Sequence, residues 1–243
     1  MPNYRLAGQK DFLQMQGEIS EICLQMAIAD ATSNPTLTRI KQVINDSYRE
    51  ICSEQPWWFL INNTSTFDTI ASQTDPYALD DTCDSVVQMS IENKQRYLIK
   101  MEYENWRKQY PWGFTGQGLQ IPIWYINAPT AFNNAQQVLL YPAADAVYTI
   151  TYVFKRRVFE MSDDTDQPLI PPEFQDVIVA RACWNIFRHR NDNRAEQWRV
   201  DYERRYAKMW KRNEEESMEF KRDSGGSVAR LIQPYNSTLN QGM

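Results

Sequence analysis

Few residues of this 243-residue chain have the types and spacing that catalysis requires. A nucleophile–base site would have to use His189, the one histidine, which lies in the polar stretch 188-RHRND-192. A histidine at a polar helix end more often caps the helix or faces water. The sequence has neither a GxGxxG nor a GxxxxGK[ST] phosphate-binding pattern. We predict no enzyme, no catalytic residue and no cofactor, and a hydrolase with an unrecognised carboxylate cluster is the weakest function that we consider.

Metal binding has two weak candidates. The four cysteines, Cys23, Cys52, Cys83 and Cys183, are isolated in the sequence and form neither a zinc pattern nor a disulfide framework. The acidic run 160-EMSDDTDQ-167 brings three aspartates close enough to hold Ca²⁺, but it lacks the glycine and the distal glutamate of an EF-hand loop. We prefer a solvated loop before a helix and predict no metal site.

The overall composition says more about the cellular compartment of the protein than about its binding partners. The chain has 26 basic and 31 acidic residues, and a net charge of −5 favours solubility without indicating a partner. Free cysteines suit a reducing cytoplasm. The start MPNYRLAGQKDF lacks an apolar signal core, and no run approaches the roughly 18 apolar residues that span a bilayer. We expect no membrane contact, and a protein made and kept in a cytoplasm or in a particle assembled there.

The most distinctive stretch combines basic and aromatic residues, most of them in the predicted helix that follows the break 191-NDN-193. Residues 181–212 hold ten Arg or Lys against four acidic residues. This helix could bind nucleic acid, or it could pair Asp201 with Arg205 and use its arginine stems and aromatic rings against a protein neighbour. We favour protein contact and keep a nucleic-acid-binding accessory protein that uses residues 194–212 as the alternative. The interface candidates are Trp198, Arg199, Tyr202, Arg205, Tyr206 and Trp210.

The C-terminal residues are a second interface candidate. The stretch 223-DSGGS-227 indicates a flexible hinge. The apolar residues after it suit an arm that docks as an added strand on another subunit, although a frayed terminus explains the composition equally well. The candidates here are Leu231, Ile232, Pro234 and Tyr235.

The stretch 48-YREICSEQPWWFL-60 places Trp57 and Trp58 directly after a helix that Pro56 must end. Paired tryptophans could mark a ligand site, a partner site or a seam between structural layers. If Trp57 begins a strand, the two rings point to opposite faces and cannot both line one pocket. We therefore predict a seam, in which one ring packs under the helices and the other covers the β region.

Hydrophobic periodicity predicts an α+β protein with a helical bundle, an inserted antiparallel β domain and an extended tail. Within the β domain we expect five to seven short strands, including 58–67 and 95–100, and a hairpin of 138–141 with the alternating strand near 148–154. The four predicted parts are an N-terminal helical hairpin (1–56), the β domain with one short helix (57–160), a C-terminal helical hairpin that packs on the first (161–222), and the arm (223–243).

The order of these pieces across residues 33–215 resembles the head-to-tail adaptor (connector) proteins of tailed bacteriophages. A helix leads into a Pro-Trp and a strand, a Pro-x-x-Tyr strand follows, and Tyr-Pro precedes an alternating strand. An Asp/Thr-rich loop then enters a Pro-initiated helix. The corresponding segments are 37-LTRIKQVINDSYREI-51, 56-PWWFLINNTSTF-67, 122-PIWY-125, 139-LLYPAADAVYTITYVFKRR-157 and 163-DDTDQPLIPPEFQDVIVARA-182.

The resemblance implies a structural protein of the virion neck, made in the cytoplasm of a bacterial host. Such adaptors form rings, typically of twelve copies, that bind the portal ring on one side and tail or nozzle proteins on the other. A closed ring uses a heterologous interface, so each subunit needs two different faces. Genomic DNA passes through the lumen without specific binding, and the acidic excess of residues 1–170 is compatible with such passage.

Overall fold

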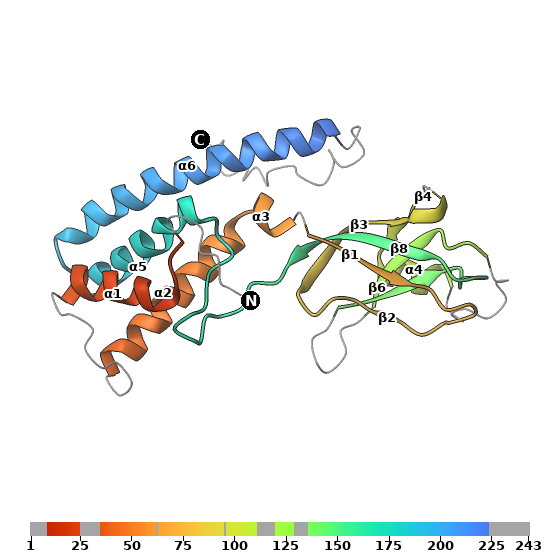
Figure 1. The fold of residues 1–243 in the computed structure, drawn as a ribbon, viewed down its shortest axis with the longest axis horizontal. Coiled ribbons are helices and arrows are strands. Elements are labelled where there is room, and N and C mark those ends of the chain that lie inside the picture. The colour runs from red at the N-terminus through yellow and green to blue at the C-terminus, as the bar shows by residue number, and fades with distance from the viewer. Residues whose placement is uncertain are drawn as a thin grey trace, which may run out of the picture. The chain divides into compact units, whose positions relative to one another are not determined.

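The computed structural model describes residues 9–24, 35–61, 63–94, 96–110, 120–128 and 136–223. The chain divides into two compact units, Met1–Phe59 with Val158–Met243, and Leu60–Arg157 (Figure 1). The described part of the first is helical, and that of the second is built mainly from strands, which confirms the α+β class. The predicted arm lies outside the described residues from position 224 onward.

Helix α5 is the central element of the helical unit. It contacts α1, α2 and α6, and it lies between α6 and the other two helices in Figure 1. Most of its residues, from Val177 to Phe187, are buried, as expected for a helix that has neighbours on several sides. The helices of this unit are α1 (Phe12–Leu24), α2 (Pro35–Glu54), η2 (Pro172–Phe174), α5 (Asp176–His189) and α6 (Arg194–Asp223).

Helices α1 and α2 bury the apolar stripes that their periodicity predicts. Phe12, Met15 and Ile19 of α1 are fully buried, as are Ile44 and Ile51 of α2. Their spacing of three, four and seven residues places them on one face of each helix. Helix α2 ends at Glu54, two residues before Pro56, as the sequence predicts.

The β unit contains two four-stranded sheets. The first has the order β1-β8-β3-β4, and the second has the order β2-β7-β6-β5. All ladders are antiparallel except β5 with β6, which is parallel. The strands are β1 (Asn63–Asp68), β2 (Tyr77–Ala78), β3 (Cys83–Ile91), β4 (Arg96–Tyr97), β5 (Ile99–Met101), β6 (Trp124–Ala128), β7 (Gln137–Tyr141) and β8 (Thr149–Arg156).

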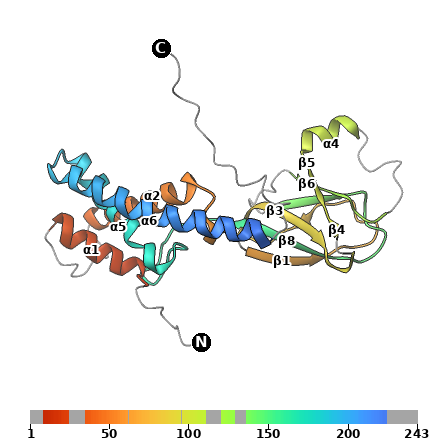
Figure 2. The same cartoon turned by 90° about the horizontal axis from the view of Figure 1, so that it is seen from above.

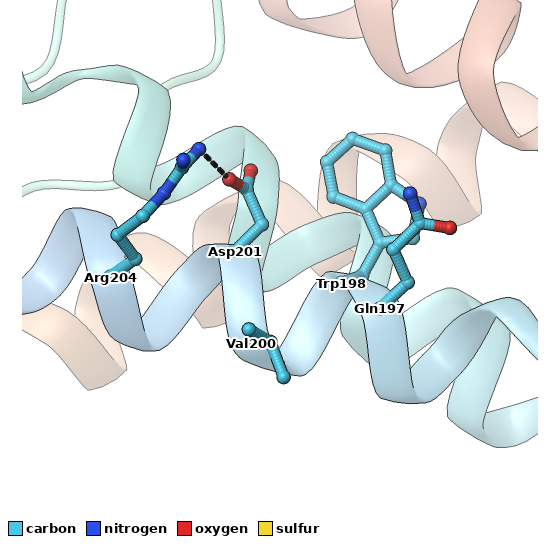
Figure 3. A pocket seen from close by; sticks show the side chains of 5 residues that line it. All are labelled: Gln197, Trp198, Val200, Asp201 and Arg204. Carbon is cyan, nitrogen blue, oxygen red and sulfur yellow. Dashed lines mark hydrogen bonds and ion pairs between the residues drawn. The ribbon is translucent and has the colours of Figure 1, made fainter.

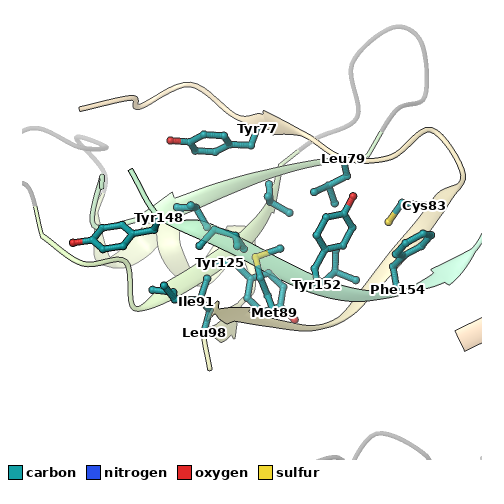
Figure 4. Close-up of a cluster of buried hydrophobic side chains, with 14 of the residues drawn as sticks. Tyr77, Leu79, Cys83, Met89, Ile91, Leu98, Tyr125, Tyr148, Tyr152 and Phe154 are labelled. Atoms are coloured by element: carbon teal, nitrogen blue, oxygen red, sulfur yellow. The ribbon is translucent and has the colours of Figure 1, made fainter. Parts of the chain in front are cut away.

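The core of this unit is formed by side chains from both sheets. Met89 and Tyr152 of the first sheet belong to one buried cluster with Tyr125 and Leu140 of the second (Figure 4). On the other side of the second sheet, helix α4 (Tyr103–Gln109) packs Trp106 into a separate buried cluster. The second sheet is therefore covered on both faces, which explains why every residue of β7 from Val138 to Tyr141 is buried, whereas burial alternates along β8.

The predicted hairpin of 138–141 with 148–154 is wrong. Strand β7 pairs with β2 and β6 in one sheet, and β8 pairs with β1 and β3 in the other. After Pro142, other segments bind the backbone: Gln120 N–H donates to Ala143 O (3.1 Å) and Ser72 N–H donates to Ala144 O (2.8 Å). The segment after Pro142 is thus held by long-range hydrogen bonds and connects one sheet to the other. Its sequence, Pro-Ala-Ala-Asp-Ala, nevertheless resembles a local turn.

Two predicted strands are also interrupted. Trp58–Ile61 forms the short helix α3, which buries both Leu60 and Ile61, adjacent residues that a strand would point to opposite faces. In the stretch 95–100 the chain changes sheet at Leu98, whose N–H donates to Met89 O, whereas Ile99 N–H donates to Ile123 O (both 2.9 Å). The described residues therefore contain eight strands instead of five to seven.

Candidate interaction surface

Trp57 is buried where the chain leaves α2 and meets α6. Its side chain is 0 % exposed, and its indole N–H donates to the carbonyl of Ile51 (2.6 Å), one of the last carbonyls of α2, which have no partner within the helix. The ring stands edge-on to Tyr206 and Trp210 of α6, with centroids 5.6 and 6.3 Å away. These two interface candidates thus contact Trp57 within the same chain.

Trp58 contacts the same helical unit. Its backbone N–H donates to Asn213 Oδ1 of α6 (2.9 Å), and its ring stands edge-on to Phe59 (4.9 Å) and Phe174 (5.9 Å). Asn213 is 6 % exposed, and nothing in the charged sequence around it distinguishes it as a buried residue. Together the two tryptophans attach the middle of α6 to the segment that follows α2.

Tyr202 belongs to a stack that joins three helices. It is 6 % exposed and lies over Trp184 of α5 with a centroid distance of 5.7 Å and an interplanar angle of 27°. The Arg181 guanidinium lies 4.9 Å from the Tyr202 ring and bonds the Glu50 carboxylate of α2 (2.9 Å). Burial raises the pKa of the Tyr202 hydroxyl. Tyr202 therefore has little surface left for another protein.

Trp198 is the aromatic candidate of α6 with a neighbouring open pocket. Its ring stacks on Phe187 (6.4 Å, 26°) and is half-buried. Beside it lies a pocket of about 420 Å³ (Figure 3). One of the lining residues, Val200, is 53 % exposed to solvent. The described lining residues are Gln197, Trp198, Val200, Asp201 and Arg204.

The arginines of α6 have acidic partners on the chain itself. Arg199 contacts both Glu196 and Glu203, and Asp201 accepts hydrogen bonds from Arg204 and Arg205, so the predicted Asp201–Arg205 pair is confirmed. Arg194 pairs with Asp192, and hydrogen bonds from Arg194 lower the pKa of Asp192 to about 2. Arg212 pairs with Glu215 and Glu216. In residues 194–216, the part of α6 whose side chains the structure describes, Lys208 and Lys211 are the bases without an ion pair.

A chain of alternating charges joins α1, α5 and α6. Lys10 Nζ lies 2.6 Å from both Glu18 Oε2 and Asp176 Oδ1, and the second Asp176 oxygen lies 2.9 Å from Arg205. Burial raises the pKa of Asp176, but hydrogen bonds and charges from Lys10 and Arg205 outweigh it, so the pKa falls below its usual value. Burial also disfavours the charged form of Lys10 and therefore lowers its pKa. The hydrogen bonds from Lys10 to Asp176 and Glu18 outweigh this effect, so the pKa of Lys10 rises above its usual value.

The other candidates from the sequence are placed as follows. His189 is exposed in the last turn of α5. In the acidic run, Asp166 accepts hydrogen bonds from the backbone N–H groups of Ser162 (2.7 Å) and Asp163 (2.9 Å), and Asp164 pairs with Lys41 of α2. No cluster of three potential metal ligands occurs in the ranges that the structure describes. Leu231, Ile232, Pro234 and Tyr235 lie outside those ranges.

The cysteines are less isolated than the sequence indicates. All four are free and buried, and the Cys23 and Cys183 side chains are hydrogen-bonded to each other between α1 and α5. That bond lowers the pKa of Cys23 and raises that of Cys183. Their separation along the chain leaves no signal that could have revealed the contact. Of the helices in the described residues, none has the length and apolarity needed to cross a membrane.

We predict that Trp57→Ala destabilises the helical unit by about 3–5 kcal/mol, because it removes a fully buried ring and leaves a cavity. The measurement is urea unfolding followed by far-ultraviolet circular dichroism. Phe159→Ala, which removes a ring that is 53 % exposed, is the control and should change the free energy of unfolding by no more than about 0.5 kcal/mol. Equal effects of the two substitutions would contradict the role assigned to Trp57.

The charge chain predicts a pH-dependent contribution to stability. Because the pKa of Asp176 is lowered by folding, its contribution is present above the unfolded value of about 3.9 and is lost as pH falls through the folded pKa. Asp176→Asn should therefore be less stable than wild type near pH 7, and the difference should shrink below about pH 4. We expect less than about 1 kcal/mol, because Asp176 is half exposed.

A double-mutant cycle is the control for this prediction. Lys10→Met combined with Asp176→Asn should lower the free energy of unfolding by less than the sum of the two single changes. Each substitution alone already removes the contact between Lys10 and Asp176. Urea unfolding from pH 7 to about pH 2.5 gives both quantities. A difference between wild type and Asp176→Asn that stays constant over this range would show that the carboxylate charge contributes nothing.

Comparison with known proteins supports one family. The family model for the SU10 adaptor protein matches residues 11–229. This range includes most of the residues of both units that the structure describes. No curated protein gives a significant match. The family match agrees with the resemblance to phage head-to-tail adaptors that the order of sequence segments indicates. The chain belongs to the SU10 adaptor protein family and is a structural adaptor protein of a bacteriophage.

Proposed function

We propose that this protein is a building block of the virion neck that joins the portal ring to the tail and has no enzymatic activity. It forms a closed ring, of twelve copies as in the adaptors it resembles, and genomic DNA passes through the lumen without specific binding. The family match over residues 11–229 is the observation that carries this proposal. The experiment that tests it is assembly of the purified protein with its portal and tail proteins.

Exposed apolar side chains of the β unit support a role in assembly. Ile70 (61 % exposed) and Val147 (66 %) lie on two neighbouring segments that are joined by the Thr69 N–H to Tyr148 O hydrogen bond. Tyr97 (60 %) and Ile99 (59 %) are exposed on β4 and β5. Large apolar side chains that gather on a surface are typical of protein contacts. They give the β unit candidate contact sites in addition to the Trp198 pocket of the helical unit.

The ion pairs between the arginines of α6 and carboxylates of the same chain favour binding to protein over binding to nucleic acid. Binding to phosphates gains affinity when unpaired Lys and Arg side chains release counterions. The arginines of α6 from Arg194 to Arg212 already contact carboxylates of this chain, which leaves Lys208 and Lys211 as the unpaired bases of residues 194–216. We therefore propose that Trp198 and Arg199 contribute to a subunit or partner contact, and that Tyr202, Tyr206 and Trp210 support this surface from inside.

Assembly is measured by size-exclusion chromatography of chemically cross-linked mixtures with portal and with tail protein. We expect a species of ring size that contains the adaptor and the portal. The adaptor alone can remain a monomer until the portal is present, so a monomer in isolation does not contradict the proposal. Failure to associate with either the portal or the tail protein under any condition would overturn it.

Deletion of residues 224–243 should leave the two units folded and weaken assembly. The expected readouts are an unchanged circular dichroism spectrum and a smaller fraction of cross-linked ring. Leu231→Ser with Ile232→Ser should reproduce the loss, and Asn240→Ser with Gln241→Ser is the matched control that should not. Assembly of the truncated chain at the wild-type level would show that the arm takes no part.

Fluorescence titration with DNA at several salt concentrations separates the adaptor from the nucleic-acid-binding alternative. Because the arginines are internally paired, we expect weak binding with a shallow dependence on salt. Arg204→Ala with Arg205→Ala should then change the slope little. A steep slope that this double variant abolishes would favour the alternative.

A further inference from the structure

Strand β1 is an open edge of the β unit over its whole length. It has six residues and pairs with β8 alone within the part of the chain that the structure describes (Figure 2). The outermost strands at the other three sheet edges, β2, β4 and β5, have only two or three residues each. Edge strands that short offer little for another chain to pair with, whereas six residues offer a usable ladder. Because β4 pairs only with Ser90 and Ile91, much of β3 is also open on that side within the described residues, but the register of β3 with β8 shifts twice.

The register shows which groups of β1 face the open edge. Thr69 N–H donates to Tyr148 O, so alternate residues back along the strand, Phe67, Ser65 and Asn63, exchange hydrogen bonds with β8. The backbone N–H and C=O groups of Thr64, Thr66 and Asp68 must therefore point away from β8. The side chains of these three residues are exposed.

This edge lacks the features by which proteins commonly prevent strand addition. It contains no proline or lysine, and its register with β8 is continuous, unlike that of β3 with β8. Its one charge is Asp68, at the last position. Phe67 fixes the strand from inside, with its ring 5.1 Å from Tyr77 and 6.0 Å from Tyr152. The open edge is thus already in the strand conformation, so β1 itself loses little conformational entropy when another strand pairs with it.

We propose that β1 accepts residues 228–232, VARLI, of a neighbouring copy as an added strand. This inference rests on the proposed ring and names the surface on which its arm docks. Twenty residues follow Asp223, with Gly225 and Gly226 as a hinge before the apolar run. Five residues of strand extend about 17 Å, which matches the span of the β1 edge from Thr64 to Asp68.

The chemistry of the arm fits the same pairing. Val228 and Ile232 are β-branched and favour strands, and Pro234, which has no N–H to donate, sets a natural end to the ladder. Arg230 is the one charged residue of 224–243, and Asp68 is the one charged residue of β1, so the pairing brings no like charges together.

A neighbouring copy is the donor that a ring requires. If each copy gives one arm to the next and receives one from the previous, the contact is heterologous and closes on itself, with every β1 edge paired. Reciprocal exchange between two copies would end assembly at a dimer. Insertion of the arm into β1 of its own chain would fill the edge without joining subunits.

The first test is Thr66→Pro against Thr66→Ala. Proline removes an N–H that faces the open edge and leaves the ladder with β8 intact, whereas alanine keeps the N–H and removes only the side chain. We expect Thr66→Pro to weaken assembly at least about fivefold, the effect of one lost hydrogen bond per subunit, and Thr66→Ala to assemble like wild type. Equal assembly of the two variants would count against the proposal.

The second test does not depend on how well Thr66→Pro folds. Chains with Thr66→Cys are mixed with chains that carry Val228→Cys, Arg230→Cys or Ile232→Cys, assembled with the portal and oxidised. The native cysteines are buried. We expect disulfide-linked pairs with at least one arm position, and multimers when both substitutions lie on one chain.

The outcomes separate this inference from the proposed function. If wild type associates with neither the portal nor the tail protein, both fail. If wild type forms rings but none of the three arm positions cross-links and Thr66→Pro assembles normally, the docking site is wrong and the adaptor role stands. If the doubly substituted chain cross-links only within itself, the arm occupies its own β1 edge and the exchange between copies is wrong.

Discussion

The burial of Trp57 against α6 is the interaction on which the helical unit depends most. Its indole N–H donates to a carbonyl at the end of α2 that has no partner within the helix, and its ring packs edge-to-face with Tyr206 and Trp210. One residue later, the Trp58 backbone binds Asn213. A 30-residue helix with a polar, charged sequence is thereby attached at three successive turns to the point where the chain leaves the helices for the β unit. Without this attachment, α6 would be held mainly by its contacts with α5.

This use of aromatic residues changes where partners are expected to bind. A basic and aromatic helix in a sequence suggests a binding face, yet most of these rings pack on α2, α5 and the Trp57 segment, and the arginines contact carboxylates of the same chain. The surface left for partners is more modest: the Trp198 pocket, the exposed apolar side chains of the β unit, and the open edge of β1. Such a distribution over both units suits the proposed ring subunit, which would contact its copies and two different proteins in the same particle.

The sequence predicts those features that depend on nearby residues. The apolar stripes of α1 and α2, the end of α2 before Pro56 and the Asp201–Arg205 pair all follow from spacings of three or four residues or from the geometry of proline. The pairing of β7 and β8 could not be predicted, because strands elsewhere in the chain compete for them and the intervening Pro-Ala-Ala-Asp-Ala resembles a turn. The same holds for Asn213, for the link from Lys10 to Asp176 and for the contact of Cys23 with Cys183, in which each partner lies far away in sequence.

Electron microscopy of the wild-type protein mixed with its portal tests the adaptor role most directly. We predict an additional ring of density on one rim of the portal, coaxial with it, with one copy of this chain per repeating unit and an open lumen that is wide enough for duplex DNA. Portal particles that never carry this density, together with an absence of density on the tail protein, would contradict the claim that the chain joins the two.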